Sequence, residues 1–270
     1  MGFRKWVWAI GLFGSSLSMS WAAAPGDSDG ITLESTRVIY PASAKNGITF
    51  TVTNHTQYVY LLQSRVLQWA IETPAEAPVM VEDEPIADVN ITAQTEAADN
   101  VVSPSFIVLP PLTRFAPNEA MTLRIRLTKN DFPRDQESVF LLSLKAIPSQ
   151  ANPSSKQDET GALMVLALQN NLKLFYRPEG LPLMSADARA EALQFSRHGA
   201  QLTINNPTPY YVTLGQVKIG NSQLDVGAKR MLAPFTSATY PDARQGATTV
   251  SWQLIDDEGQ QTPLLTQALP

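Results

Sequence analysis

From Gly30 onward the sequence is a succession of short β-rich runs separated by turn residues, and almost no stretch has the apolar spacing of a helix. The first two runs, 36–40 and 48–52, are rich in β-branched residues, and a polar turn at 53–56 follows them. Further runs lie at 58–67, 106–109, 121–127, 139–144 and 162–175. Short runs bounded by Pro, Asn, Asp or Gly predict an all-β protein built from sandwiches.

The turn-rich segment 177–182, with the sequence RPEGLP, predicts a domain boundary because its two prolines stop a strand from continuing. A second set of short β-rich runs follows it. We therefore expect one sandwich domain over 30–177 and a smaller one over 178–270. The one helix we expect is short, at 185–194, with Ser185 as its cap.

Two stretches interrupt the strand pattern of the first domain. Residues 70–104 are rich in Ala, Pro, Glu and Asp, and they separate two strands that a compact sandwich would normally join directly. Residues 149–161 are polar throughout. Both are predicted to be long exposed loops, and 70–104 is interpreted as an insertion.

The N-terminus has the pattern of a secretory signal peptide over residues 1–22. Arg4 and Lys5 precede an apolar run at 6–13, and small residues lead to Ala22. The apolar run is shorter than the ~20 residues that a membrane-spanning helix needs. We expect cleavage after Ala22, which leaves 18 basic and 25 acidic residues and a formal net charge of −7. The mature chain is thus predicted to be exported and acidic.

The chain has no cysteine and two histidines, His55 and His198, both in polar turns where we expect them to be exposed. Disulfides, thiol nucleophiles and cysteine-ligated metals are excluded. No GxSxG, phosphate-loop or GxGxxG motif occurs in the mature chain, so an enzyme is not indicated, and we expect no cofactor and no metal. The acidic balance also argues against nucleic acid as a partner.

The run at 162–168 is apolar in both of its phases, with Met164, Leu166 and Leu168 on one face. One interpretation is a central strand that is buried on both sides. The other is an apolar sheet edge, which needs a partner to cover it. The run follows a polar loop and leads directly out of the domain, and this position favours an edge that accepts a strand from another chain.

Arg37 and Lys173 are cations placed among apolar neighbours in their strands. For either residue alone, an aliphatic stem that extends its charge to water is a sufficient explanation. If the first and last strands of the domain come together, the two cations form a pocket for a carboxylate.

The sequence resembles the periplasmic pilus-assembly chaperones of the chaperone–usher pathway over essentially the whole mature chain. The segments that carry the resemblance are 36–40 (TRVIY), 52–54 (VTN), 110–117 (PPLTRFAP), 123–125 (LRI), 137–140 (ESVF), 173–178 (KLFYRP) and 205–210 (NNPTPY). The resemblance implies two immunoglobulin-like β-sandwich domains in a boomerang arrangement. It also implies a chaperone that binds, folds and caps pilus subunits by lending them a strand, and that delivers them to an outer-membrane usher.

By the same resemblance, Arg37 and Lys173 hold the C-terminal carboxylate of a subunit. Met164, Leu166 and Leu168 enter the subunit's groove from the donor strand 162–175. Glu137, Arg177 and Asp242 form a structural interdomain set. Self-association of the unloaded protein is a further expectation, since a free apolar strand favours it. The alternatives are a structural pilin or adhesin-type sandwich, which would be expected to have a donor N-terminal extension, and a carbohydrate-active enzyme, which no motif supports.

Overall fold

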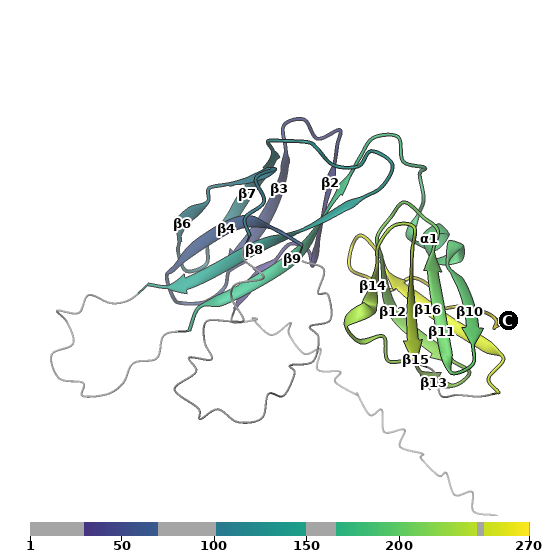
Figure 1. The fold of residues 1–270 in the computed structure, drawn as a ribbon. Coiled ribbons are helices and arrows are strands. Elements are labelled where there is room, and N and C mark those ends of the chain that lie inside the picture. The colour runs from purple at the N-terminus through teal and green to yellow at the C-terminus, as the bar shows by residue number, and fades with distance from the viewer. Residues whose placement is uncertain (1–29, 70–100, 150–165, 242–245, 270) are drawn as a thin grey trace, which may run out of the picture.

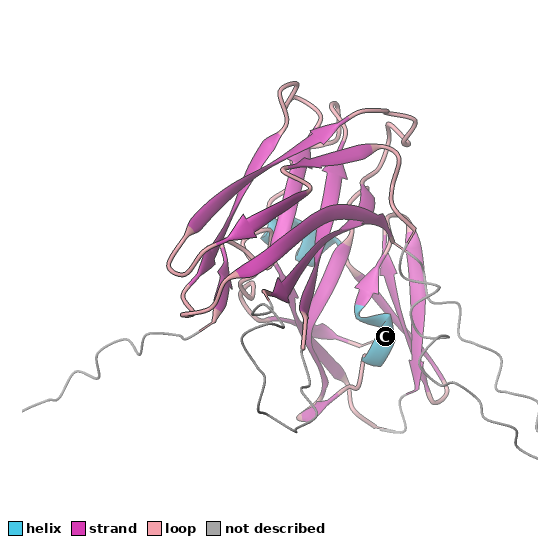
Figure 2. Ribbon diagram, turned by 90° about the vertical axis from the view of Figure 1, so that its left-hand side faces the viewer, coloured by secondary structure: helices cyan, strands magenta, loops and turns pink. Residues whose placement is uncertain are grey.

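The computed structural model describes residues 30–69, 101–149, 166–241 and 246–269. Strands dominate the described chain (Figure 2). They form two β-sandwich domains that meet at an angle, with the N-terminal domain in purple to teal and the C-terminal domain in green to yellow (Figure 1). The all-β, two-domain fold predicted from the sequence is confirmed.

The first sheet of the N-terminal domain has four antiparallel strands. Its order is β1 (Ile31–Leu33), β3 (Ile48–Asn54), β7 (Ala120–Leu127) and β5 (Phe106–Leu109). The strands alternate between buried and outward side chains, as expected for a sheet with one face on the core.

The second sheet of this domain has five strands. Its order is β2 (Arg37–Pro41), β9 (Leu168–Arg177), β8 (Ser138–Pro148), β4 (Tyr60–Gln68) and β6 (Leu112–Phe115). β2 and β9 are parallel, whereas the other pairs are antiparallel. The first strand of this sheet in the chain thus lies beside the last.

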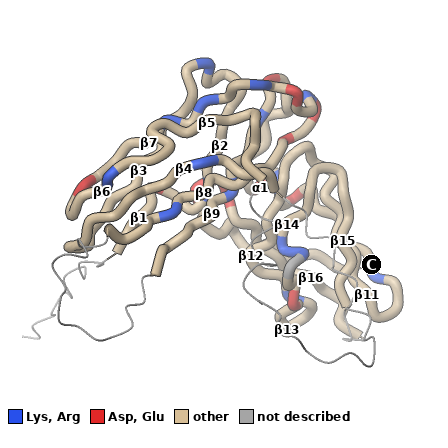
Figure 3. The backbone as a smooth tube through the Cα atoms, turned by 60° about the vertical axis from the view of Figure 1, so that its left-hand side comes forward, with Lys and Arg blue, Asp and Glu red and all other residues tan. Residues whose placement is uncertain are grey.

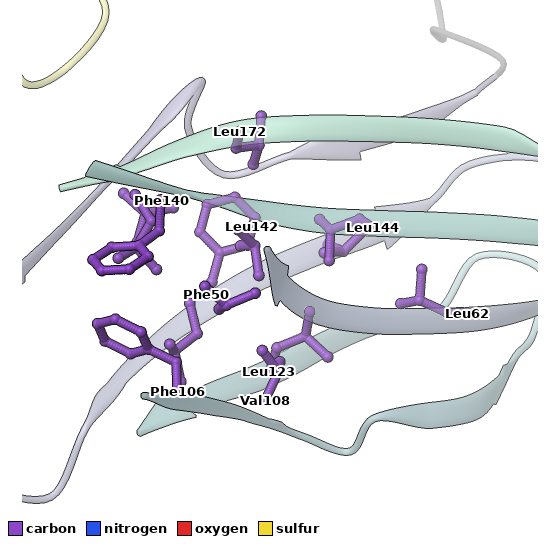
Figure 4. Packing of buried hydrophobic residues seen from close by; sticks show 14 of the residues in the cluster. Phe50, Leu62, Phe106, Val108, Leu123, Phe140, Leu142, Leu144 and Leu172 are labelled. Carbon is purple, nitrogen blue, oxygen red and sulfur yellow. The ribbon is translucent and has the colours of Figure 1, made fainter. Parts of the chain in front are cut away.

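The N-terminal core fills the space between the two sheets (Figure 4). One sheet contributes Phe50, Phe106, Val108 and Leu123, and the other contributes Leu62, Phe140, Leu142, Leu144 and Leu172. All of these side chains are buried. Their burial stabilises the sandwich without any disulfide, which this cysteine-free chain cannot form.

The C-terminal domain also packs two sheets. The smaller contains β10 (Gln194–His198), β11 (Gln201–Asn206) and β15 (Thr236–Pro241), and the larger contains β13 (Ser222–Gln223), β12 (Val212–Ile219), β16 (Thr249–Ile255), β17 (Leu265–Ala268) and β14 (Met231–Leu232). The 3-10 helix η2 (Gly227–Arg230) precedes β14. The helix α1 (Ala186–Ala192) is capped by Ser185, whose hydroxyl accepts from the Ala188 N–H at 3.1 Å.

Each domain contains the same turn, built on an N-x-T-x-Y sequence around a buried asparagine and threonine. In the N-terminal domain, Asn54 Nδ2 donates to the carbonyl of Tyr58 at 2.9 Å, and its Oδ1 accepts from the Thr56 N–H and hydroxyl. In the C-terminal domain, Asn206 makes the equivalent bonds with Tyr210 and Thr208. Both asparagines are fully buried. The same sequence pattern therefore forms the same turn in both sandwiches.

Residues 101–103, near the end of the expected insertion, pair with the end of β4. Leu67 and Val102 form an antiparallel bridge, and the Ser103 N–H donates to the Val66 carbonyl at 2.9 Å. The buried Ser103 explains this pairing. Residues 70–100 of the insertion, the signal peptide and most of the predicted 149–161 loop lie outside the described residues.

Candidate functional site

The parallel pairing of β2 with β9 brings Arg37 and Lys173 together. Their Cα atoms are direct partners across the ladder. Both side chains are half-buried and leave the sheet on the face turned to the C-terminal domain, as the contact of Phe175 with Tyr211 shows for the same phase of β9. The condition for a two-cation pocket, that the first and last strands meet, is therefore met in the structure.

Arg37 is held by backbone of the other domain. Its Nη1 donates to the carbonyls of Ile255 at 2.9 Å and Asp256 at 3.0 Å. Its guanidinium also lies 5.7 Å from the centre of the Phe175 ring. The guanidinium is thus anchored before any ligand arrives.

Lys173 projects its ammonium over the ring of Trp69, with Nζ 5.4 Å from the ring centre. Burial lowers the pKa of Lys173, and the positive charges of Arg37 and Arg230 lower it further. Arg230 belongs to the C-terminal domain, where its guanidinium donates to the carbonyls of Leu214 and Gly215. Sequence reasoning missed Arg230, because nothing in its local sequence indicates that it approaches Lys173.

Within the described residues, neither Arg37 nor Lys173 forms an ion pair with a carboxylate. Two partly desolvated neighbouring cations repel one another, and a carboxylate placed between them removes that cost through charge-assisted hydrogen bonds. The arrangement is therefore suited to binding an anion.

The N-terminal half of β9 is a free sheet edge that begins with the exposed Leu168 and continues through the polar Gln169, Asn170 and Asn171. Residues Leu168–Leu172 pair with β8 on one side only, whereas residues 173–176 lie between β8 and β2. Leu166 and Leu168 are 70% and 52% exposed, although they share a strand phase with the buried Leu172. Met164 lies outside the described residues. β2 covers β9 only from Lys173 onward, so the side chains of Leu166 and Leu168 are left exposed.

A charged network joins the two domains at their junction, where acidic and basic segments meet in Figure 3. The buried Oε1 of Glu137 accepts a hydrogen bond from Nε of Arg177 at 2.8 Å and forms an ion pair with its Nη2 at 2.7 Å. Glu137 Oε2 accepts from the Tyr211 N–H at 2.9 Å. Burial raises the pKa of Glu137, and the Arg177 guanidinium acts against this rise.

Asp257 completes this network from the C-terminal domain. Its two oxygens accept from Arg177 at 3.1 Å and from Arg189 at 3.2 Å, and both guanidinium groups lie over the Tyr210 ring. Asp242, which we expected in the network, lies outside the described residues. Asp257 was missed because Asp256, Asp257 and Glu258 adjoin in one turn, and the sequence does not distinguish them.

Two family models together match most of the chain. The model for the N-terminal domain of PapD, described as a pili and flagellar-assembly chaperone, matches residues 30–95 and 75–182. The model for the C-terminal domain of the pili assembly chaperone PapD matches residues 188–266. The chain belongs to the pilus-assembly chaperone family. The resemblance noted in the sequence is thereby confirmed, and a structural pilin or adhesin is not favoured.

Relatives of this pilus-assembly chaperone match over nearly their full length. The chaperone protein FimC of Escherichia coli K12 is 32% identical over 94% of this chain and 91% of its own. The chaperone protein FimB/FhaD of Bordetella pertussis is 31% identical over 96% of each chain. The family is one of chaperones, and an enzymatic activity is not a property that these matches indicate.

Solved structures of chaperones are similar to both domains taken together. The crystal structure of the E. coli chaperone DraB has a TM-score of 0.66 and 28% identity, and it covers 89% of this chain and 98% of its own. A chain in the structure of the Salmonella enterica SafA pilin in complex with the SafB chaperone has the same TM-score and 26% identity, with coverage of 89% and 96%. None of the described helices is both long enough and apolar enough to span a membrane.

Proposed function

We propose that this pilus-assembly chaperone captures pilus subunits in the periplasm by lending them β9 as a missing strand. The observation that carries the proposal is the alignment of two features on one strand. The exposed Leu166 and Leu168 lie at the start of the same edge that leads, through the polar residues 169–171, to Lys173, which is paired with Arg37. About 17 Å of extended strand separates Leu168 from Lys173. A strand that pairs with this edge therefore brings one end of its chain to the cations.

The two parts of the site have different tasks in this mechanism. Main-chain bonds to the edge contribute roughly 1 kcal/mol each, and each bulky side chain that enters a subunit groove contributes roughly 1.5 to 3 kcal/mol. Neither contribution fixes the register, since a slip by two residues preserves both. A terminal carboxylate held by Arg37 and Lys173 fixes it, because a chain has one C-terminus.

Release is proposed to occur by strand exchange at an outer-membrane usher, because strand addition forms no covalent bond and the mechanism assigns no hydrolysis to this chain. Between rounds of capture, the exposed Leu166 and Leu168 favour self-association, in which the edges of two copies cover one another. Light scattering at increasing concentration tests this expectation, and a constant molar mass would contradict it.

The capture mechanism is tested by periplasmic co-expression with a candidate pilus subunit, both intact and without its last residues. We expect the intact protein to be recovered with the chaperone and the truncated one to be lost. Arg37→Ala and Lys173→Ala should each abolish recovery of the intact protein while the chaperone itself stays folded. Equal recovery of both forms, or full recovery with either variant, would overturn the carboxylate clamp.

A further inference from the structure

A loop of the C-terminal domain, Asp256–Gln260, contacts the N-terminal domain beside the candidate site. Gly259 lies directly against Thr36, and a Cβ added at Gly259 would overlap Thr36 Oγ1. Thr36 precedes Arg37, whose Nη1 donates to the carbonyls of Ile255 and Asp256 at the start of the same loop. The close approach at Gly259 and the anchoring of Arg37 thus belong to one contact.

Hydrogen bonds within the loop join its residues, so we expect it to move as a unit. Asp256 Oδ1 accepts from the N–H groups of Glu258 at 3.1 Å and Gln260 at 2.6 Å. The Asp256 N–H donates to the Gln260 carbonyl at 2.8 Å, and the Gly259 N–H donates to the Asp256 carbonyl at 3.2 Å. Gly259 has a φ of +85°, which favours glycine. A displacement of Gly259 therefore displaces the carbonyls that hold Arg37.

The hydrogen bonds that Arg37 forms within the described residues leave some donors of its anchored guanidinium available. A guanidinium carries five N–H groups, and the two carbonyls occupy those on Nη1. The groups on Nε and Nη2 remain, and together they form the fork that matches a carboxylate. A side chain that is ordered before binding also spares the complex the entropy cost of ordering it.

We propose that Gly259 is a positioning residue for subunit capture, because its lack of a side chain lets the C-terminal domain approach Thr36 and hold Arg37 in place. The inference rests on the proposed function of Arg37 and adds to it a requirement for the second domain. It gives the C-terminal domain a direct part in presenting the clamp, in addition to the ion pairs of Asp257.

The test compares Gly259→Ala with Gly199→Ala. Gly199 also has a positive φ, +59°, but a Cβ there meets nothing within 4 Å. The control therefore carries the backbone strain without the overlap. A third variant, Thr36→Ala with Gly259→Ala, removes the overlap and keeps the strain, because the remaining neighbour, Thr36 Cβ, is at 3.8 Å. Thr36→Ala alone is the reference for the double variant, and Arg37→Ala is the fifth variant.

The probe is the same candidate pilus subunit, intact and without its last residues. We expect Gly259→Ala to lower the recovery of the intact protein about tenfold, the loss expected when charge-assisted bonds no longer hold one binding group. The truncated protein should be lost with every variant, as with the wild type, and it therefore measures the background of the assay. Gly199→Ala should behave as the wild type, and the double variant should recover to the level of Thr36→Ala alone.

A second readout is independent of the subunit. The chain has no cysteine, so Thr49→Cys and His198→Cys, both at exposed positions, place one spin label on each domain. Gly259→Ala should shift or broaden the distance between the labels, and the double variant should restore it.

The outcomes separate the two ideas. If Arg37→Ala captures the intact protein normally, the clamp itself fails, and the positioning role fails with it. If Arg37→Ala loses capture while Gly259→Ala matches Gly199→Ala, the clamp stands and the positioning role is overturned. If Gly259→Ala does not accumulate as folded protein, the double variant is compared with Thr36→Ala alone. A folded double variant that captures less than Thr36→Ala also overturns the role of the overlap.

Discussion

Arg37 and Lys173 are direct neighbours across the parallel ladder of β2 and β9, and no ion pair with a carboxylate accompanies either of them in the described residues. Two half-buried like charges side by side destabilise a folded domain. The charges of Asp257, Asp256 and Glu137 act in favour of the Arg37 charge, and a carboxylate bound between the two cations would reduce their repulsion further. Charged groups that destabilise the free protein and are stabilised by a ligand are typical of functional sites.

Lys173→Met is therefore expected to raise the free energy of unfolding at pH 7 or leave it unchanged, while it abolishes capture. The folded-state pKa of Lys173 lies below the ordinary value of 10.5 because of burial and then the charge of Arg37. The folded state thus gives up the proton more readily than the unfolded state, and wild-type stability rises as the pH climbs through the folded pKa toward 10.5. Denaturant unfolding from pH 7 to 10.5 measures this rise.

The variant should lack that part of the rise. Lys45→Met is the control, since the Lys45 ammonium is 76% exposed and pairs with Glu179 at 3.2 Å, a contact worth under about 1 kcal/mol. A Lys173→Met protein that is clearly less stable than the wild type at pH 7 would show that the lysine is structural.

Leu168→Glu should abolish subunit capture and leave the free energy of unfolding within about 0.5 kcal/mol of the wild type. Leu168 is 52% exposed on the edge half of β9, so the folded chaperone loses little, whereas an apolar groove cannot accept a carboxylate. Gln169→Glu is the matched control, because Gln169 is the next residue, is also exposed and points to the other face. Co-purification and denaturant unfolding measure both effects. Retained capture by Leu168→Glu would exclude this face of β9 from the groove.

Features set by neighbouring residues could be predicted from the sequence, whereas contacts between distant segments could not. The apolar run ending at Leu168 was visible because strand periodicity is a local property, and the partnership of Arg37 with Lys173 was reached only as a condition on two distant strands. Asp257 and Arg230 were missed because their roles arise across the domain junction. The pairing of 101–103 with β4 was missed because it follows from tertiary contact.

Asp257→Asn should weaken the coupling between the domains and flatten the acid dependence of stability. Burial alone would raise the pKa of Asp257, but the hydrogen bond and charge of Arg177, together with Arg189, hold it below its ordinary value of 3.8. The carboxylate then contributes stability that is present above pH 3.8 and lost as the pH falls through its folded pKa. Thermal unfolding between pH 2 and 6 measures this loss, and an Asp257→Asn protein with the wild-type acid profile would contradict it.

The N-x-T-x-Y turn that the two domains share should stabilise each domain independently. Asn206→Ala removes a side chain that bonds to Tyr210 and Ala233 carbonyls and to both donors of Thr208, so about 3 kcal/mol of stability should be lost. Asn205→Ala, one position away with its amide on an exposed bond to Gln194, should cost within about 0.5 kcal/mol. Denaturant unfolding compares the pair. Equal losses would mean that burial of the turn, and not its asparagine, supplies the stability.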